Sequence, residues 1–369
     1  MKKNFFYFGF LAISLLGAAS CSDSDSPEKD DPSKEPAYVA PVIKDGAFIL
    51  TQGAYYAKLE GGLFALDYST GTMTDYVFKK VNDRNLGATP QCGIVYGSKM
   101  YLGIWESNTI EILDRYSFRC LEQISLGNSE NGQKPRSMVA YNGKVYVSMY
   151  DGKVTRLDTL SMRIDASVEV GPNPDKMALY NGRLYVPITD GENWGADNYA
   201  GTTVSVVSLS PFEMEKSIDV PFNPTSCVAA AGSVFVLCKG NYADIPSALY
   251  QIKEDDSTEE IGKGNMVAAS GDKLYLVDAV YMGKNSYYIY DIPSKTLSPF
   301  PIADVEYPSG IAVDEKSGKV FISSYQLIDN KPQYELPCYL CELDLTGKLL
   351  KKYDIGVGEA SIFFTPAQK

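Results

Sequence analysis

The chain has 369 residues, a formal net charge of −12 and no histidine. The acidic balance argues against a nucleic-acid-binding protein, because the phosphate backbone would be repelled and no Lys/Arg-rich run offsets that repulsion. The missing histidines remove the commonest general base and metal ligand, which disfavours many enzyme classes but leaves carboxylate and tyrosine chemistry open.

The N-terminus has the features of a targeting segment. Lys2 and Lys3 precede an apolar run at 5–16, which is too short to span a bilayer, and small residues then lead to Cys21. This order resembles a bacterial lipoprotein signal. We therefore expect residues 1–20 to be a signal peptide and Cys21 to be the lipidation site; the alternative is an ordinary secretory signal cleaved nearby.

Residues 21–41 are rich in Ser, Pro and acidic side chains and nearly free of apolar ones. Such a segment cannot bury a core, so we expect a flexible tether. An acidic run directly after a lipid-bearing cysteine resembles the surface-export signal of Bacteroidetes lipoproteins. That resemblance implies a lipid-anchored protein of the outer membrane, exposed at the cell surface, whereas a plain linker would also suit a periplasm-facing protein.

Residues 42–369 contain an irregular repeat. A turn followed by an apolar–aromatic–apolar segment recurs at intervals of 39 to 53 residues, with its aromatic at Phe48, Tyr101, Tyr146, Tyr185, Phe235, Tyr275 and Phe321. The segments between are short, alternate in polarity and are bounded by Gly, Asn, Asp and Pro. Repeats of this size with strand and turn patterning predict an all-β fold, a seven-bladed β-propeller.

Each unit divides into four strands, which we name a to d. In the third unit the pattern predicts strands at 137–142, 144–150, 153–160 and 163–170. A proline often introduces strand a, and strand c often ends on an Asp whose carboxylate can accept N–H groups of the c–d turn. We interpret these Asp residues (67, 114, 158, 291 and 344) as structural.

The first unit lacks a strand a, whereas residues 358–366 match the strand-a pattern. We therefore predict that the C-terminal strand completes the first blade and closes the ring, so that no long unpaired edge remains at the junction.

Insertions fall mostly on one side of each unit. From strand-b aromatic to the end of strand c the spacing ranges from 12 residues (Tyr146 to Asp158) to 23 (Phe321 to Asp344), while a–b turns stay short. Loops on a rigid scaffold carry function, so the rim that bears the b–c and d–a loops is the candidate site. Every b–c segment supplies Tyr or Trp, which give rigid amphipathic contact area. The ligand-binding candidates there are Tyr55, Tyr56, Trp105, Tyr150, Trp194, Tyr199, Tyr242, Tyr281, Tyr325 and Tyr334.

Polar residues near the starts of the a strands are expected close to the central axis. Arg84 and Arg136 are the ligand-binding candidates of this kind, and Asn85, Gln91, Lys176, Ser226, Asn265 and Ser309 share the placement. They either contact a ligand or merely hydrate the channel.

Motifs for other chemistry are weak. The stretch at 190–198 lacks the ligand that an EF-hand needs at its fifth position, where Trp194 stands, so we expect no metal and no cofactor. We interpret the six cysteines beyond Cys21 as packing residues. Carboxylates in the b–c loops could pair for glycoside or lyase chemistry, although sequence does not show that any two converge; they are Glu60, Glu106, Asp151, Asp190, Glu192, Asp197 and Asp244.

Three stretches, at 82–91, 133–159 and 170–186, resemble the YncE-like surface propellers of Bacteroidetes, and the resemblance covers essentially all of residues 42–369. Within that family the chain is similar to the BtuG group, whose members capture vitamin B12 and pass it to a TonB-dependent transporter. The resemblance implies a non-catalytic capture protein for a large nutrient, with a cobamide as the best guess. The alternatives are a loop-carboxylate lyase or hydrolase acting on a glycan, and a protein-interaction propeller that docks on a transporter.

Overall fold

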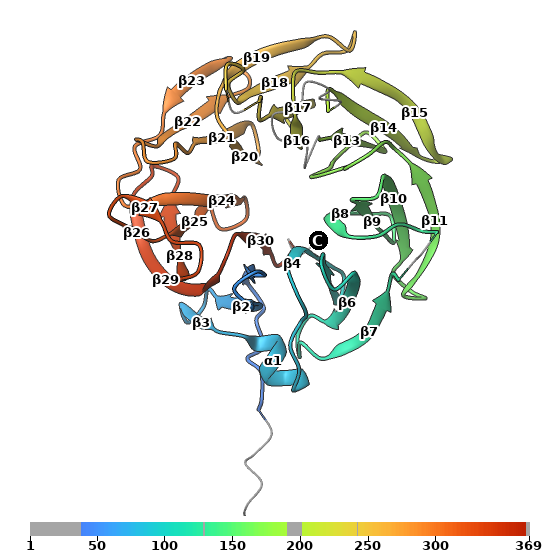
Figure 1. Cartoon of the computed structure of the whole chain (residues 1–369), viewed down its shortest axis with the longest axis vertical. Helices are drawn as coiled ribbons and strands as arrows, with labels where there is room; N and C mark the ends of the chain where they lie inside the picture. The colour runs from blue at the N-terminus through green and yellow to red at the C-terminus, as the bar shows by residue number, and fades with distance from the viewer. Residues whose placement is uncertain (1–37, 128–129, 190–200, 242, 367–369) are drawn as a thin grey trace, which may run out of the picture. The chain divides into compact units, whose positions relative to one another are not determined.

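The computed structural model describes residues 38–366, apart from 128–129, 190–200 and 242. The predicted signal peptide, Cys21 and most of the predicted tether therefore lie outside the described residues. Seven four-stranded antiparallel sheets are arranged as blades around a central axis (Figure 1), which confirms the predicted seven-bladed β-propeller. Within the described part of the chain, no helix has both the length and the apolar character that crossing a membrane requires.

The first blade joins the two ends of the propeller. It contains β1 (Gly46–Ala54), β2 (Leu59–Asp67), β3 (Thr72–Thr74) and, as its innermost strand, β30 (Ala360–Phe364). β30 pairs antiparallel with β1 and places Phe363 opposite Phe48, so the predicted closure is confirmed. A one-and-a-half-turn helix, α1 (Val77–Asn82), follows β3 and was not predicted.

The other six blades follow in chain order, each built from consecutive strands a to d. Blades 2 to 4 comprise β4 (Pro90–Tyr96), β5 (Lys99–Ile104), β6 (Thr109–Asp114) and β7 (Cys120–Ser125); β8 (Pro135–Tyr141), β9 (Lys144–Met149), β10 (Lys153–Asp158) and β11 (Arg163–Glu169); and β12 (Ala178–Tyr180), β13 (Arg183–Ile188), β14 (Thr203–Leu209) and β15 (Phe212–Asp219). The predicted strands of the third unit thus lie within two residues of the observed ones.

Blades 5 to 7 complete the ring. They comprise β16 (Pro224–Ala230), β17 (Ser233–Cys238), β18 (Ala248–Ile252) and β19 (Thr258–Lys263); β20 (Met266–Ser270), β21 (Lys273–Asp278), β22 (Ser286–Asp291) and β23 (Thr296–Pro299); and β24 (Tyr307–Asp314), β25 (Lys319–Tyr325), β28 (Pro337–Asp344) and β29 (Leu349–Val357). A small hairpin, β26 (Leu327–Ile328) with β27 (Lys331–Pro332), is inserted between strands b and c of blade 7.

Turn chemistry explains why the strands reverse where they do. Asn142 and Gly143 connect β8 to β9 with positive φ at both positions, as a two-residue hairpin of this hand requires. At the c–d turns the Asp that ends strand c accepts backbone N–H groups: Asp158 from Ser161 at 2.7 Å and Asp291 from Ser294 at 3.0 Å. The hydroxyl of Ser294, which also donates to Asp291, lowers the pKa of Asp291 together with this backbone bond. The structural role predicted for these residues is confirmed.

The repeated aromatic of strand b packs between neighbouring blades. Phe48, Tyr101, Phe235 and Phe321 are at most 1 % exposed. Phe321 of blade 7, for example, stacks on Tyr68 of blade 1 with ring centroids 6.0 Å apart. Burial of an aromatic of this size stabilises each interface by a few kcal/mol, so the repeated aromatic side chain holds neighbouring blades together.

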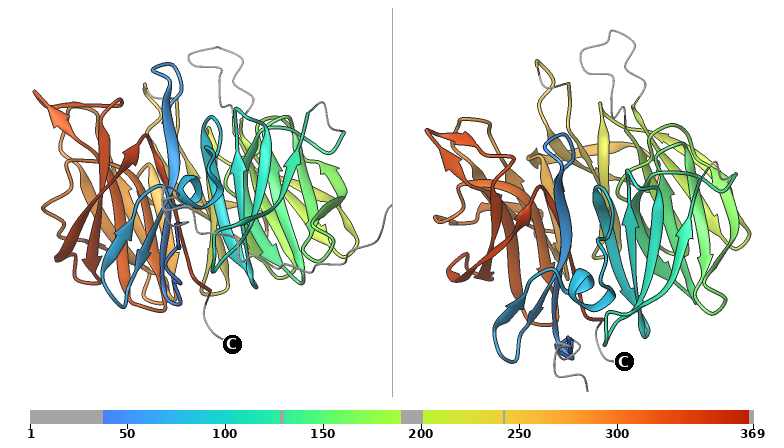
Figure 2. Two further views of the ribbon diagram at one scale, coloured as in Figure 1. Left: turned by 90° about the horizontal axis from the view of Figure 1, so that it is seen from below. Right: turned by 60° about the horizontal axis from the view of Figure 1, so that its bottom comes forward.

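The long insertions gather at one rim. The β1–β2 hairpin, in blue, and the β26–β27 hairpin, in orange-red, project at the same rim of the ring in Figure 2. Antiparallel pairing places every b–c loop at this rim together with the d–a loops. The two rims are therefore unequal, as the loop lengths predict.

Candidate functional site

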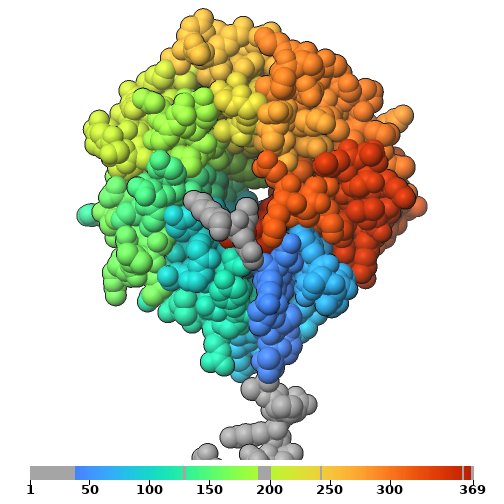
Figure 3. Space-filling view, turned by 180° about the vertical axis from the view of Figure 1, so that it is seen from behind, coloured from blue at the N-terminus to red at the C-terminus, as the bar shows by residue number. Residues whose placement is uncertain are grey.

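A channel with a volume of about 880 Å³ runs into the centre of the ring. All seven blades contribute to its lining, and the lining residues come from strand-a starts, strand-b ends, and b–c and d–a loops. Figure 3 shows an opening at the centre of the ring on the opposite rim, the face behind Figure 1. Because the lining residues stand at strand-a starts, strand-b ends and the adjoining loops, the cavity belongs to the elaborate rim, where the sequence predicts the site.

One side of the channel is cationic. We define the cationic wall as Arg136, Lys176 and Lys239, with Asp175, from blades 3, 4 and 5. A nitrogen Nη2 of Arg136 donates to Oδ2 of Asp175 at 2.8 Å. Burial disfavours the charge of Arg136, but the attraction and hydrogen bond of Asp175 outweigh it, so the pKa of Arg136 is raised. Among the described residues, Nε of Arg136 and Oδ1 of Asp175 have no hydrogen-bond partner.

Backbone hydrogen bonds hold the two lysines of the cationic wall. The N–H of Lys176 donates to the carbonyl of Thr225 at 3.2 Å, and the N–H of Lys239 donates to the carbonyl of Asn223 at 2.8 Å. The start of blade 5 therefore lies between them. Two strand spacings separate Lys176 and Lys239 across the sheet, and they are also offset along the strand, since Lys176 bridges to Ser226 and Lys239 is bonded at Asn223. Their backbones therefore lie about 14 Å apart.

Two aromatic residues extend the lining from blades 2 and 3. The rings of Trp105 and Tyr150 meet edge to face with centroids 5.8 Å apart. Lys134 lies over Trp105 at 4.2 Å, and the guanidinium of Arg136 lies 5.6 Å from the ring centre of Tyr150. Cations at such distances are attracted by the ring faces, so these contacts fix the orientation of both aromatics.

The opposite side of the channel is aromatic. We define the tyrosine wall as Tyr307, Tyr325 and Tyr334, all from blade 7. Ring centroids of Tyr325 lie 6.3 Å from Tyr307 and 5.0 Å from Tyr334, and Tyr281 of blade 6 packs on Tyr307 at 6.4 Å. Burial raises the pKa of Tyr325, and burial together with Tyr307 and Tyr281 raises the pKa of Tyr334 to about 12. The wall is therefore neutral at physiological pH.

Blade 1 adds an acid and, together with blade 2, a pair of amides. Glu359 lines the channel just before β30, and its negative charge contributes to the raised pKa values of Tyr325 and Tyr334. The amide of Gln52 donates to the side-chain oxygen of Gln91 at 3.4 Å. This side of the channel thus combines aromatic surface with one carboxylate.

The structure brings part of the predicted set together. Trp105, Arg136, Tyr150, Tyr325 and Tyr334 line the channel. Tyr55 and Tyr56, at the tip of the β1–β2 hairpin, are 53 % and 98 % exposed and do not line it, and Tyr281 reaches it only through Tyr307. The predicted residues Trp194, Tyr199, Tyr242 and Cys21 lie outside the described residues.

The structure corrects the placement predicted for Arg84, which was expected near the central axis. Its guanidinium forms two hydrogen bonds with the fully buried Glu111 of β6, at 2.9 and 2.8 Å, and does not line the channel. The expectation failed because α1 lengthens the connection after β3 and turns Arg84 toward the interface of blades 1 and 2.

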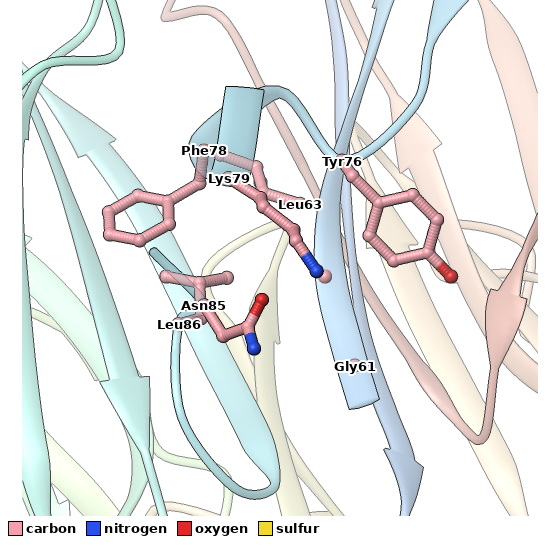
Figure 4. A pocket seen from close by; sticks show the side chains of 8 residues that line it. Gly61, Leu63, Tyr76, Phe78, Lys79, Asn85 and Leu86 are labelled. Atoms are coloured by element: carbon pink, nitrogen blue, oxygen red, sulfur yellow. The ribbon is translucent and has the colours of Figure 1, made fainter. Parts of the chain in front are cut away.

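A notch of about 10 Å³ between α1 and β2, lined by Leu63, Phe78 and Leu86 among others (Figure 4), has room for only about one water.

Sequence reasoning missed several lining residues: Tyr307, Asp175, Lys239 and Glu359. Asp175 immediately precedes Lys176, and Glu359 immediately precedes β30. Including one more residue before each strand-a start among the candidates would have found both. Tyr307 precedes Pro308 and is found by the same signal. Lys239 follows strand b directly and is the polar counterpart of Trp105 and Tyr150.

The loop carboxylates do not assemble at the channel. Glu60, Glu106, Asp151 and Asp244 do not line it, and Asp190, Glu192 and Asp197 lie outside the described residues. In the described part of the chain, no group of three His, Cys, Asp or Glu residues is placed to hold a metal ion. The six described cysteines are free thiols.

No protein-family model matches the sequence, and no curated protein matches it. Among solved structures the chain is similar to hydrazine synthase of Kuenenia stuttgartiensis, with a TM-score of 0.57 and 12 % identity over 73 % of this chain and 87 % of that one. It is also similar to the WD40 repeats of RRP9 (TM-score 0.54, 11 % identity, 74 % and 83 % covered) and to BamB from Moraxella catarrhalis (0.50, 14 %, 78 % and 81 %). At such identities the likeness shows the fold alone: the chain is a β-propeller.

Proposed function

We propose that this protein is a YncE-like, non-catalytic capture protein that binds a large amphipathic small molecule in its central channel. The best single candidate for the ligand is a cobamide. In this proposal the lipid anchor at Cys21 holds the propeller on the outer membrane, at the cell surface, and the captured ligand passes to a TonB-dependent transporter.

The observation that carries the proposal is the channel itself. Its volume of about 880 Å³ lies toward the upper end of the range of roughly 300–1,000 Å³ that small-molecule sites occupy. Its two sides differ in character, one cationic and one aromatic, so it suits a ligand with both a polar and an apolar face. Tyr and Trp supply such contacts with little loss of side-chain entropy.

A cobamide matches these requirements. Its corrin ring offers a broad apolar edge that can pack on the tyrosine wall, and its peripheral amides can exchange hydrogen bonds with polar lining residues such as Gln52 and Asn265. Because the chain has no histidine, no imidazole of this protein could replace an axial ligand of cobalt. Capture would therefore rest on the edges of the ring and its substituents.

The test is calorimetric titration of the mature protein with cyanocobalamin. We expect saturable 1:1 binding with a negative heat-capacity change, since apolar surface is buried. Replacing Tyr334 with Ala should weaken binding about tenfold, as expected for an aromatic hot spot. The matched control is Tyr116→Ala: this ring is 41 % exposed, but it lies in a c–d turn at the other rim. A flat titration at micromolar protein would remove the cobamide.

A further inference from the structure

We propose that the cationic wall is an anion-binding subsite, in which Lys176 and Lys239 take a phosphate or carboxylate group of the captured ligand. This inference rests on the proposed function, because it assigns a chemical class to the ligand of the same channel.

The first argument is the contrast in charge. The whole chain carries a formal net charge of −12, yet the charged residues that line the channel are three cations, Arg136, Lys176 and Lys239, and two acids, Asp175 and Glu359. An acidic protein whose central channel is lined by one more cation than acid attracts anions there rather than over its surface.

The second argument is how these charges are paired. Arg136 and Asp175 neutralise one another at 2.8 Å. Within the described ranges, Lys176 and Lys239 form no ion pair. Lys176 is exposed, although the residues on either side of it in the sequence, Asp175 and Met177, are buried. Their ammonium groups therefore keep donors available for a ligand. Hydrogen bonds from an ammonium to an anion are about twice as strong as neutral ones.

The third argument is geometry. The backbones of Lys176 and Lys239 flank the segment 223–225, to which both are hydrogen-bonded. With about 14 Å between the two backbones, the long flexible stems can still reach one anionic group from two sides. Because the anchoring bonds are made by the main chain, replacing either side chain leaves the frame of the wall intact.

The opposite side of the channel fixes how a ligand would be oriented. The tyrosine wall and Glu359 come from blades 7 and 1, which lie across the ring from blade 4, the blade of Lys176 (Figure 1). An apolar body would pack against the tyrosines while its anionic group points to the lysines. Glu359 would repel a ligand bound the other way round, so the channel selects one orientation.

The experiment compares cyanocobalamin, which carries a phosphodiester, with dicyanocobinamide, which lacks it. Titrations use the mature wild-type protein, Lys176→Gln, Lys239→Gln and the control Lys263→Gln, which removes the same charge from the exposed outer strand β19. We expect each wall variant to weaken cyanocobalamin about tenfold and to reduce the salt dependence of its affinity, with cobinamide and the control variant unchanged. Equal binding of both corrinoids, with no effect of the wall variants, would overturn the subsite while leaving the capture function standing.

A second arm uses oligogalacturonate, whose carboxylates supply the same chemistry from a glycan, against neutral maltohexaose. Binding of oligogalacturonate that depends on Lys176 and Lys239, without binding of cyanocobalamin, would support the subsite and remove the cobamide from the proposed function. If neither cyanocobalamin nor oligogalacturonate binds, the inference is wrong.

Discussion

The cationic wall and the tyrosine wall line the same channel but are held in place by different parts of the chain. Main-chain hydrogen bonds to segment 223–225 anchor Lys176 and Lys239, so their side chains contribute little to the packing of the blades. In the tyrosine wall the side chains themselves form the contacts, and Tyr325 is only 7 % exposed within a hydrophobic cluster shared by blades 1 and 7. Replacing the lysines of the cationic wall should therefore affect ligand binding but not stability. Replacing residues of the tyrosine wall should affect both.

The largest effect is expected inside the tyrosine wall. Tyr325→Ala should lower the free energy of unfolding by about 3–4 kcal/mol, because it leaves a cavity where a buried ring packs on two others. Tyr334→Ala, which truncates a ring that is 51 % exposed, should cost under about 1 kcal/mol. Urea unfolding of both variants checks this, and equal losses would show that the wall is not divided into a packed and an exposed ring.

Within the cationic wall, only the Arg136–Asp175 pair should matter to stability. Asp175→Ala should lower the free energy of unfolding by about 2 kcal/mol, because it leaves a largely desolvated guanidinium without its partner. The double replacement Asp175→Ala, Arg136→Met should recover most of that loss. A double variant less stable than Asp175→Ala would mean that Arg136 stabilises the wall through other contacts.

Alkaline pH should act on the tyrosine wall. Burial raises the pKa of Tyr325 above the ordinary value of 10.0, so the folded protein holds this proton to higher pH than the unfolded chain. Stability contributed by the neutral phenol is present below pH 10 and is lost as pH rises beyond it. Unfolding measured between about pH 9 and about pH 11 should show this decline, with a smaller slope in Tyr325→Phe. An identical slope in that variant would assign the decline to other tyrosines.

The smallest effect on stability is expected for the lysines. Lys176→Gln and Lys239→Gln should each change the free energy of unfolding by less than about 0.5 kcal/mol, because their side chains make no ion pair within the described ranges. Thermal melts check this. A loss of more than about 1 kcal/mol would show that the lysines stabilise the blades, and the contrast between the two walls would fail.

The fold was predictable because its signals repeat. One aromatic per unit, an Asp at the end of strand c and an orphan strand-a pattern at 358–366 are enough to count the blades and close the ring. The site was only partly predictable, since a propeller brings single residues from every blade to the axis. Trp105 and Tyr150 follow strand b directly and were placed correctly, whereas Tyr55 and Tyr56 occupy a hairpin tip whose direction depends on its length. Arg84 was misplaced because six residues of helix, whose N-cap residue Tyr76 makes no side-chain cap bond, redirect the chain.

The pairing of β30 with β1 has a consequence for biogenesis. The inner strand of the first sheet comes from residues 360–364, more than 300 residues after their partners at 47–51. The first sheet therefore lacks its inner strand until almost the whole chain has been made. Until then β1 presents unsatisfied main-chain groups to any neighbouring polypeptide. Truncations close to the C-terminus that remove β30 should therefore be far more harmful than the few residues they delete would suggest, because they leave this edge of β1 unpaired.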